Sequence, residues 1–266
     1  MTAKDHHTLE GKVALVTGGS RGIGHAIALT LAQQGATVAV ASRSEEQIKN
    51  VAQELNTLTG KESFALVCDV SDSKRVQAMF STLRNDLKLE VDILVNNAGI
   101  AESATIANTS DELWTRQLAI NLSGTFFCTR GAVPAMVSKG WGRIINIASI
   151  AGKTGAPYTT AYSASKHGVL GLTRSVALEL ANTGVTVNAI CPGYVETEMV
   201  SRGVDRIATK TGRSAEETLE LLRKMNPQNR FVTVDEVAAM ALLLASDDGR
   251  GINGQAINID GGTVLF

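Results

Sequence analysis

The sequence has little of what disulfide-rich, metal-binding or nucleic-acid-binding proteins need. Its three cysteines, Cys68, Cys128 and Cys191, form no CxxC pair, and an odd, scattered set argues against a disulfide framework and a structural zinc site. The 25 basic residues nearly balance the 26 acidic ones, and there are only 4 histidines. Without excess positive charge we expect no nucleic-acid partner and no binding to an anionic membrane. We therefore expect no metal site, and a reducing, cytoplasmic location.

Long apolar runs are also missing. The longest, which includes residues 238–245, is far shorter than the roughly 18 residues that a membrane span requires. The first dozen residues lack the apolar stretch of a signal peptide. We expect residues 1–10 to form a flexible polar leader, in which His6 and His7 are solvated rather than paired on a metal.

What the sequence does contain is a regular alternation of short β-branched runs with helical patterns. Right-handed βαβ crossovers follow from this alternation, and they predict an α/β fold: a doubly wound, seven-stranded parallel sheet with helices on both faces. No linker or repeat interrupts residues 11–266, so we expect one domain. The predicted strands cover residues 13–17, 37–42, 63–68, 91–97, 143–149, 185–191 and 255–260.

The region after the sixth predicted strand departs from this rhythm. Residues 201–229 are polar, with a helix-like segment at 215–224, and a capping-box pattern at Thr233 and Glu236 opens the next helix. In an open α/β sheet such a segment overhangs the carboxyl ends of the strands, where ligands bind. We expect residues 194–229 to form the substrate loop, with Tyr194 a candidate for the cleft wall.

A glycine-rich turn follows the first predicted strand and opens a helix over residues 23–34. Gly18, Gly22 and Gly24 form a GxxxGxG pattern, a variant of the GxGxxG fingerprint. Glycine lets the backbone approach a ligand closely, and the helix N-terminus adds unpaired N–H groups and the positive end of a dipole. The turn is therefore expected to bind a pyrophosphate.

The end of the second predicted strand bears on the choice of nicotinamide cofactor. A carboxylate there would bind the ribose 2′-hydroxyl and repel a 2′-phosphate, but the sequence has Ser42 and Arg43, with a second cation, Arg21, in the glycine turn. Arginine suits phosphate through its fork of donors. We predict NADP(H) rather than NAD(H); the alternative is that Arg43 pairs with Glu45 or Glu46 on the surface.

A third group of residues, Ser149, Tyr162 and Lys166, has the character of a reaction centre. Tyrosine and lysine four residues apart share a helix face, so the ammonium can favour the phenolate. An unperturbed tyrosine has a pKa of about 10 and is a poor base near neutrality. We expect Lys166 to bring the pKa of Tyr162 closer to the working range.

Together with Asn121, the segment 96–99 and the Pro-Gly pair at 192–193, these elements resemble the short-chain dehydrogenase/reductase family in order and spacing, over about residues 11–262. The resemblance implies a single Rossmann domain that interconverts a ketone and a secondary alcohol with a nicotinamide cofactor. The chain is most similar to the branch of 3-oxoacyl thioester reductases and polyketide ketoreductases. That branch implies reduction of a 3-keto group on an acyl chain carried by coenzyme A or an acyl carrier protein.

The resemblance also implies a role for each catalytic residue. Tyr162 is expected to be the general acid in ketone reduction and the base in alcohol oxidation, while Ser149 hydrogen-bonds the substrate oxygen. Lys166 is expected to hold the nicotinamide ribose and tune Tyr162, and Asn121 to anchor a water in the proton path.

The expected cofactor contacts come from the same resemblance. Asp69 and Val70 correspond to the pair that contacts adenine, residues 97–99 to the segment beneath the cofactor, and Thr197 to the hydroxyl that fixes the carboxamide. The full predicted set is Gly18, Ser20, Arg21, Gly22, Ile23, Gly24, Ser42, Arg43, Asp69, Val70, Asn97, Ala98, Gly99, Tyr162, Lys166, Pro192, Gly193, Val195 and Thr197.

Other functions stay open at this point. Residues 230–237 resemble those of NAD-dependent 3-hydroxybutyrate dehydrogenases, although that group favours tryptophan where Tyr194 stands. A cofactor-sensing module without turnover would typically lack Tyr162 or Lys166, and both are present. An extended-family epimerase or dehydratase would need a larger region after Gly193.

The resemblance further implies a homotetramer, built through helices near residues 111–138 and 158–182 and the last strand. An acyl carrier protein is acidic, so we expect any docking surface for it to be basic; Arg130, Lys139 and Arg143 are the candidates. His25, His167, Cys128 and Cys191 are expected to be structural.

Overall fold

The computed structural model describes residues 7–266, apart from the side chain of Lys210. It confirms the predicted parallel sheet of seven strands, in the order β3-β2-β1-β4-β5-β6-β7. The strand order reverses between β1 and β4, and open α/β sheets bind ligands at such a switch point. The strands are β1 (Val13–Thr17), β2 (Thr37–Ser42), β3 (Phe64–Val67), β4 (Ile93–Asn96), β5 (Gly142–Ile147), β6 (Val185–Pro192) and β7 (Ala256–Ile259).

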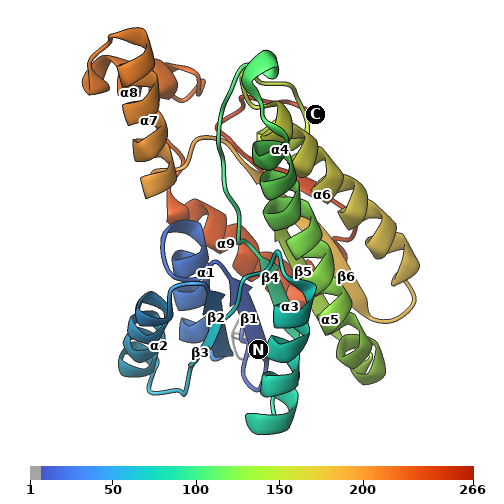
Figure 1. Ribbon diagram of the computed structural model, residues 1–266. Helices are drawn as coiled ribbons and strands as arrows, with labels where there is room; N and C mark the ends of the chain where they lie inside the picture. The colour runs from blue at the N-terminus through green and yellow to red at the C-terminus, as the bar shows by residue number, and fades with distance from the viewer. Residues whose placement is uncertain (1–6) are drawn as a thin grey trace, which may run out of the picture.

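Helices cover both faces of the sheet, as predicted (Figure 1). One apolar core packs α1, α2 and α9 against the sheet, and a second packs α3, α5 and α6 against the opposite face. Alternate residues of β1 serve the two cores: Ala14 and Val16 point into the first and Leu15 into the second. The helices are α1 (Gly22–Gln33), α2 (Glu45–Thr59), α3 (Ser73–Ser81), α4 (Asp111–Leu118), α5 (Gly124–Lys139), α6 (Thr160–Glu179), α7 (Glu198–Thr211), α8 (Ala215–Lys224) and α9 (Val234–Ala245).

The segment after β6 contains one helix that the sequence predicted and one that it did not. Helix α8 matches the predicted segment 215–224, and α7 occupies residues that were expected to be a polar loop. Most side chains of α7 are polar, but Val200, Val204 and Ile207 form an apolar stripe at helical spacing. Figure 1 shows α7 and α8 projecting beyond the body of the sheet.

The residues expected to form a flexible leader lie partly outside the described structure, which excludes residues 1–6 and therefore His6. The described part of the leader is ordered against the core, contrary to the prediction. Leu9 is buried, and its N–H donates to the carbonyl of Gln34 at 2.7 Å. His7 is also not simply solvated, because its Nδ1 lies 3.1 Å from the hydroxyl of Ser246.

All three cysteines are buried and free. Burial raises the pKa of Cys68 and Cys191 to about 11 and that of Cys128 further, so these thiols are inert, as predicted for Cys128 and Cys191. Within residues 7–266 no group of three or more potential ligands could hold a metal ion. No helix in this part of the chain is long and apolar enough to cross a membrane.

Candidate active site

Two cavities meet at the carboxyl edge of the sheet. The first, of about 410 Å³, lies over the ends of β1, β2 and β4, and the second, of about 830 Å³, lies over the ends of β5 and β6. They share part of their wall, including Ile23, Asn97, Thr197 and Met199. Every predicted site residue lines one cavity or the other, except Gly24 and Asn121.

The glycine turn between β1 and α1 forms one wall of the first cavity. Gly18 has a φ of +64°, and a β-carbon there would lie 2.8 Å from the Cα of Ala98, so only glycine fits. Asn97 fixes the turn by donating from Nδ2 to the carbonyls of Thr17 and Gly18, each at 3.0 Å. Gly24 is a packing residue behind the turn, because a β-carbon there would overlap with Asn97 and the carbonyl of Gly18.

The start of α1 fits the predicted pyrophosphate. Arg21 stands at the N-cap position, and its side chain makes no capping hydrogen bond. The first N–H groups of a helix have no partners inside it, and they carry the positive end of the helix dipole. Gly22 and Ile23, which begin this helix, line the first cavity, so these amides are suited to an anionic ligand.

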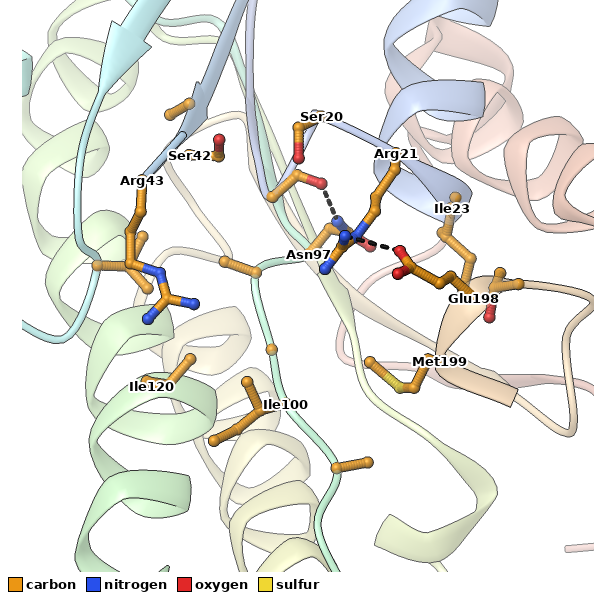
Figure 2. A pocket seen from close by; sticks show the side chains of 18 of the residues that line it. Ser20, Arg21, Ile23, Ser42, Arg43, Asn97, Ile100, Ile120, Glu198 and Met199 are labelled. Carbon is orange, nitrogen blue, oxygen red and sulfur yellow. Dashed lines mark hydrogen bonds and ion pairs between the residues drawn. The ribbon is translucent and has the colours of Figure 1, made fainter. Parts of the chain in front are cut away.

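The two arginines predicted to bind a 2′-phosphate have different surroundings. The guanidinium of Arg43 points into the first cavity from the end of β2 (Figure 2). Within residues 7–266 it has no ion pair with Glu45 or Glu46; Glu45 pairs instead with Lys49 at 2.7 Å. Arg43 is therefore available to a ligand phosphate.

Arg21 is already paired. Its Nη1 lies 2.6 Å from the carboxylate of Glu198, at the start of α7 (Figure 2). The other oxygen of Glu198 accepts from Arg202. The glycine turn is thus joined to α7 by an ion pair, and Arg21 would have to leave Glu198 to contact a phosphate.

Asp69 and Val70, which the family resemblance assigns to adenine, both line the first cavity. Partial burial raises the pKa of Asp69, but hydrogen bonds from Ser71 and the charges of Arg43 and Arg75 outweigh it, so the pKa is lowered overall. The hydroxyl of Ser71 donates to Asp69 at 2.7 Å. Asp69 is therefore an ionised acceptor near neutral pH.

Ser149, Tyr162 and Lys166 come together in the second cavity, as the sequence predicted. Ser149 follows β5, and its Oγ accepts from the N–H of Ala151 at 3.1 Å. Tyr162 and Lys166 lie near the start of α6, with the ammonium 5.7 Å from the centre of the phenol ring. The ammonium also donates to the carbonyl of Ile147 at 2.7 Å.

The pKa of Tyr162 differs from the expectation. Burial raises it, and the hydrogen bond with Ser149 opposes this only in part. Burial also lowers the pKa of Lys166 to about 8, because desolvation disfavours an ammonium as it disfavours a phenolate. In these surroundings the pKa of Tyr162 is therefore raised overall and is not brought closer to the working range, so the phenol keeps its proton at neutral pH.

Asn121 lies behind the cavity wall, in a π-helical turn (Ala119–Ser123) between α4 and α5. Its amide exchanges two hydrogen bonds of 2.9 Å with the backbone of Ile100 and donates to Ser165 Oγ at 3.0 Å. Asn121 thus joins α6 to the loop that separates the two cavities. π-helical turns inside α-helices are frequent at functional sites.

Residues 194–229 were predicted to form the substrate loop, but the helical form of α7 and its contribution to the first cavity were missed. Glu198 and Arg202 line the first cavity, Val200 lines the second, and Arg206 lines both. A signal was present, since Thr197 followed by Glu198 is a helix-start pattern and Glu198 is spaced four residues from Arg202. The structure confirms that Tyr194 lines the second cavity.

Three residues were predicted to form a basic docking surface, and the prediction is wrong for Arg143. Arg143 is only 3% exposed, and its guanidinium donates to backbone carbonyls and to Asp247. Lys139 is exposed in part but pairs with Asp92 at 2.8 Å. Arg130 remains on the surface, 5.0 Å from the ring centre of Phe126.

Comparison with known proteins identifies the family. The family described as short chain dehydrogenase matches residues 12–207. This chain is a short-chain dehydrogenase/reductase. It is 44% identical over 252 residues to a putative ketoacyl reductase of granaticin polyketide synthase from Streptomyces violaceoruber, which covers 94% of this chain and 92% of that protein.

Two further family members are similar over most of their length. A D-beta-hydroxybutyrate dehydrogenase from Rhizobium meliloti is 42% identical over 253 residues, which are 94% of this chain and 98% of that protein. Among solved structures, a variant of actinorhodin polyketide ketoreductase with NADPH has a TM-score of 0.92 and 39% identity, covering 96% and 98% of the two chains. The protein is therefore an oxidoreductase that interconverts ketones and alcohols with a nicotinamide cofactor.

Proposed function

We propose that this short-chain dehydrogenase/reductase is an NADP(H)-dependent reductase of a 3-oxoacyl thioester or a related ketone. The observation that carries the cofactor preference is the environment of Arg43. It points into the first cavity from the end of β2, it makes no ion pair within residues 7–266, and the carboxylate that its charge reaches, Asp69, lines the same cavity. The similarity to a ketoacyl reductase and to a ketoreductase solved with NADPH supports the proposal.

The residues of the second cavity suit the reducing direction. Bound reduced nicotinamide supplies a hydride to the carbonyl carbon. Tyr162, whose pKa is raised by burial, remains protonated and donates its proton to the carbonyl oxygen. Ser149 supplies a second hydroxyl donor to the same oxygen, where negative charge develops.

Lys166 and Asn121 position this pair of donors. The ammonium of Lys166 donates to the carbonyl of Ile147, and it would also hold the ribose hydroxyls of a bound cofactor. Asn121 holds the backbone of Ile100 and the hydroxyl of Ser165, and so ties α6, which carries Tyr162, to the loop after β4. We also propose that Asn121 anchors a water molecule in the proton path, as the family resemblance implies.

The test is an assay of NADPH absorbance with 3-oxoacyl thioesters and simple ketones, using Tyr162→Phe as the variant. General acids contribute about a hundred- to ten-thousand-fold to rates, so Tyr162→Phe should lose activity by that order. Its affinity for NADPH should stay within about twofold, because the phenol hydroxyl is the only group removed. Parallel reactions with NAD⁺ and 3-hydroxybutyrate test the alternative of an NAD-dependent dehydrogenase, which faster turnover of that pair would favour.

Two outcomes contradict the proposal. Full turnover by Tyr162→Phe would show that the phenol of Tyr162 is not the proton donor. Tight NADPH binding by the natural protein without turnover of any ketone would favour a cofactor-sensing module instead.

We also propose a cytoplasmic homotetramer that takes its acyl group from coenzyme A or an acyl carrier protein. The surfaces of α5 and α6 carry exposed apolar side chains, among them Phe126, Val137 and Leu178. Such side chains favour burial against another copy of the chain. For an acidic carrier, Arg130 is the preferred contact, because Arg143 is buried and Lys139 is already paired with Asp92.

A further inference from the structure

Glu198 places a carboxylate in the wall of the first cavity, where the expected ligand is itself anionic. It lines this cavity at the start of α7. One of its oxygens lies 2.6 Å from Nη1 of Arg21, and the other accepts from Arg202. The proposed transfer of a proton and a hydride takes place in the second cavity and does not use Glu198, so it does not account for this carboxylate.

We propose that Glu198 is a specificity-determining residue, which weakens the preference for NADP(H) by holding Arg21 away from the 2′-phosphate. The carboxylate occupies the guanidinium of Arg21 as a phosphate would, and bound NADP(H) replaces one anionic partner by the other. Until that exchange takes place, Arg43 alone attracts the 2′-phosphate. This inference rests on the proposed binding of NADP(H) in the first cavity and adds an opposing residue to it.

The position of Glu198 draws Arg21 away from the end of the cavity where Arg43 stands. Of the two cavities, Arg43 lines only the first, at the end of β2. Glu198 lies between Thr197 and Met199, both of which belong to the wall shared with the second cavity. Figure 2 shows the guanidinium of Arg21 turned toward Glu198, with that of Arg43 lying apart. The two arginines therefore do not converge on one phosphate while the ion pair is present.

Contact between the start of α7 and the glycine turn keeps the two charges close. A β-carbon on Gly22 would lie 3.3 Å from Cγ2 of Thr197, so the turn is in van der Waals reach of the N-cap residue of α7. Glu198 follows that residue directly, in the first turn of the helix, where the helix dipole stabilises an acidic side chain. Arg202, one turn later, holds the second oxygen of Glu198.

The strength of the ion pair allows a ligand to replace it. The side chains of Arg21 and Glu198 are 54% and 47% exposed, and an exposed ion pair shifts an equilibrium by about 1.4- to fivefold. A phosphate competes for the same guanidinium through a pair of charge-assisted hydrogen bonds. The ion pair should therefore reduce the contribution of Arg21 to NADP(H) affinity without abolishing it.

The experiment measures the Kd of NADPH and of NADH by titration of the full chain, without ketone. The natural protein is compared with Glu198→Gln, Arg21→Ala and the double variant. Glutamine keeps the size of the glutamate side chain and removes its charge. We expect Glu198→Gln to lower the Kd of NADPH by about two- to fivefold and that of NADH by less than about twofold. Arg21→Ala should cost about two- to fivefold more NADPH affinity in the Glu198→Gln background than in the natural protein, because the guanidinium is free there.

Glu220→Gln is the matched control. Glu220 is 48% exposed and also pairs with two cations, Arg223 at 3.0 Å and Lys224 at 3.7 Å, but it lines neither cavity. Glu220→Gln changes the net charge by the same amount as Glu198→Gln, and it should leave both Kd values unchanged. Added salt should diminish the effect of Glu198→Gln, because exposed charges are screened.

Other patterns overturn the inference. An unchanged or higher Kd of NADPH in Glu198→Gln would show that the carboxylate does not oppose binding. Equal tightening of NADPH and NADH would mean that Glu198 acts on the pyrophosphate that both cofactors share. The same gain in NADPH affinity with and without Arg21 would exclude the route through the ion pair.

The failure of this inference differs from the failure of the proposed function. The titrations contain no ketone, so they give the same answer whether or not the protein reduces one. Tighter binding of NADH than of NADPH by the natural protein would contradict the proposed cofactor preference. The change in the ratio of the two Kd values on Glu198→Gln would still decide the role of Glu198.

Discussion

The cofactor preference can be tested by removing the guanidinium of Arg43. Arg43→Ala leaves the glycine turn and the start of α1 intact and deletes only the group that faces the cavity from the end of β2. Hydrogen bonds to charged groups are worth about 1.5–3 kcal/mol, a ten- to hundredfold change in Kd. Because Arg43 is exposed, we expect the lower end of this range for NADPH and less than a twofold change for NADH.

Measuring cofactor affinity in Arg21→Ala distinguishes the contribution of Arg21 from that of Arg43. Arg21 must leave Glu198 before it contacts a phosphate, and an exposed ion pair is worth about 0.2–1 kcal/mol. Arg21→Ala should therefore reduce NADPH affinity by less than Arg43→Ala does. Titration of both cofactors at one fixed ionic strength gives the four Kd values, since surface charges are screened by salt.

A control is available on the neighbouring helix α2. Lys49→Ala also removes a surface cation, but Lys49 pairs with Glu45 and does not line the first cavity. It should leave both cofactors unaffected. An equal loss of NADPH and NADH affinity in Arg43→Ala would refute the assignment of Arg43 to the 2′-phosphate.

The remaining predictions concern Lys166 and the oligomeric state. Burial lowers the pKa of Lys166 from 10.5 to about 8, so the folded protein binds this proton more weakly than the unfolded chain, and the free energy of unfolding should rise between about pH 8 and pH 10.5. Lys166→Met should be up to about 3 kcal/mol more stable than the natural protein at pH 7, with the difference closing near pH 10.5; denaturant unfolding at both pH values checks this, and a constant difference would contradict the buried charge. Light scattering at micromolar concentration should give the mass of four chains, and a monomer would contradict the proposed tetramer.

Much of the fold could be predicted because its signals are local. The runs at 13–17 and 37–42 are apolar except at their ends, as buried parallel strands require, and β1 and β2 have those bounds. The capping box at Thr233 likewise fixed the start of α9. Helix α7 was missed because most of its residues are polar. Its short apolar stripe has a packing role only in the folded protein.

Properties that depend on distant residues could not be predicted. Arg21 and Glu198 lie far apart in the sequence, and only the fold makes them partners. The spacing of Tyr162 and Lys166 gave their proximity, yet their pKa values depend on burial by surrounding elements, which raises one and lowers the other. Arg143 was expected on the surface because it is charged. It is buried because residues 246 and 247, distant in the sequence, supply its hydrogen-bond partners.

Helix α7 and its N-cap residue Thr197 form a wall shared by the two cavities, which the proposed function assigns to cofactor and ketone; the shared residues include Thr197, Met199 and Arg206. A redesign of substrate range that alters these positions therefore changes the affinity for nicotinamide nucleotides as well. Changes at Leu222 in α8 or at Met225, which follows this helix, avoid that side effect, because the two residues line only the larger cavity.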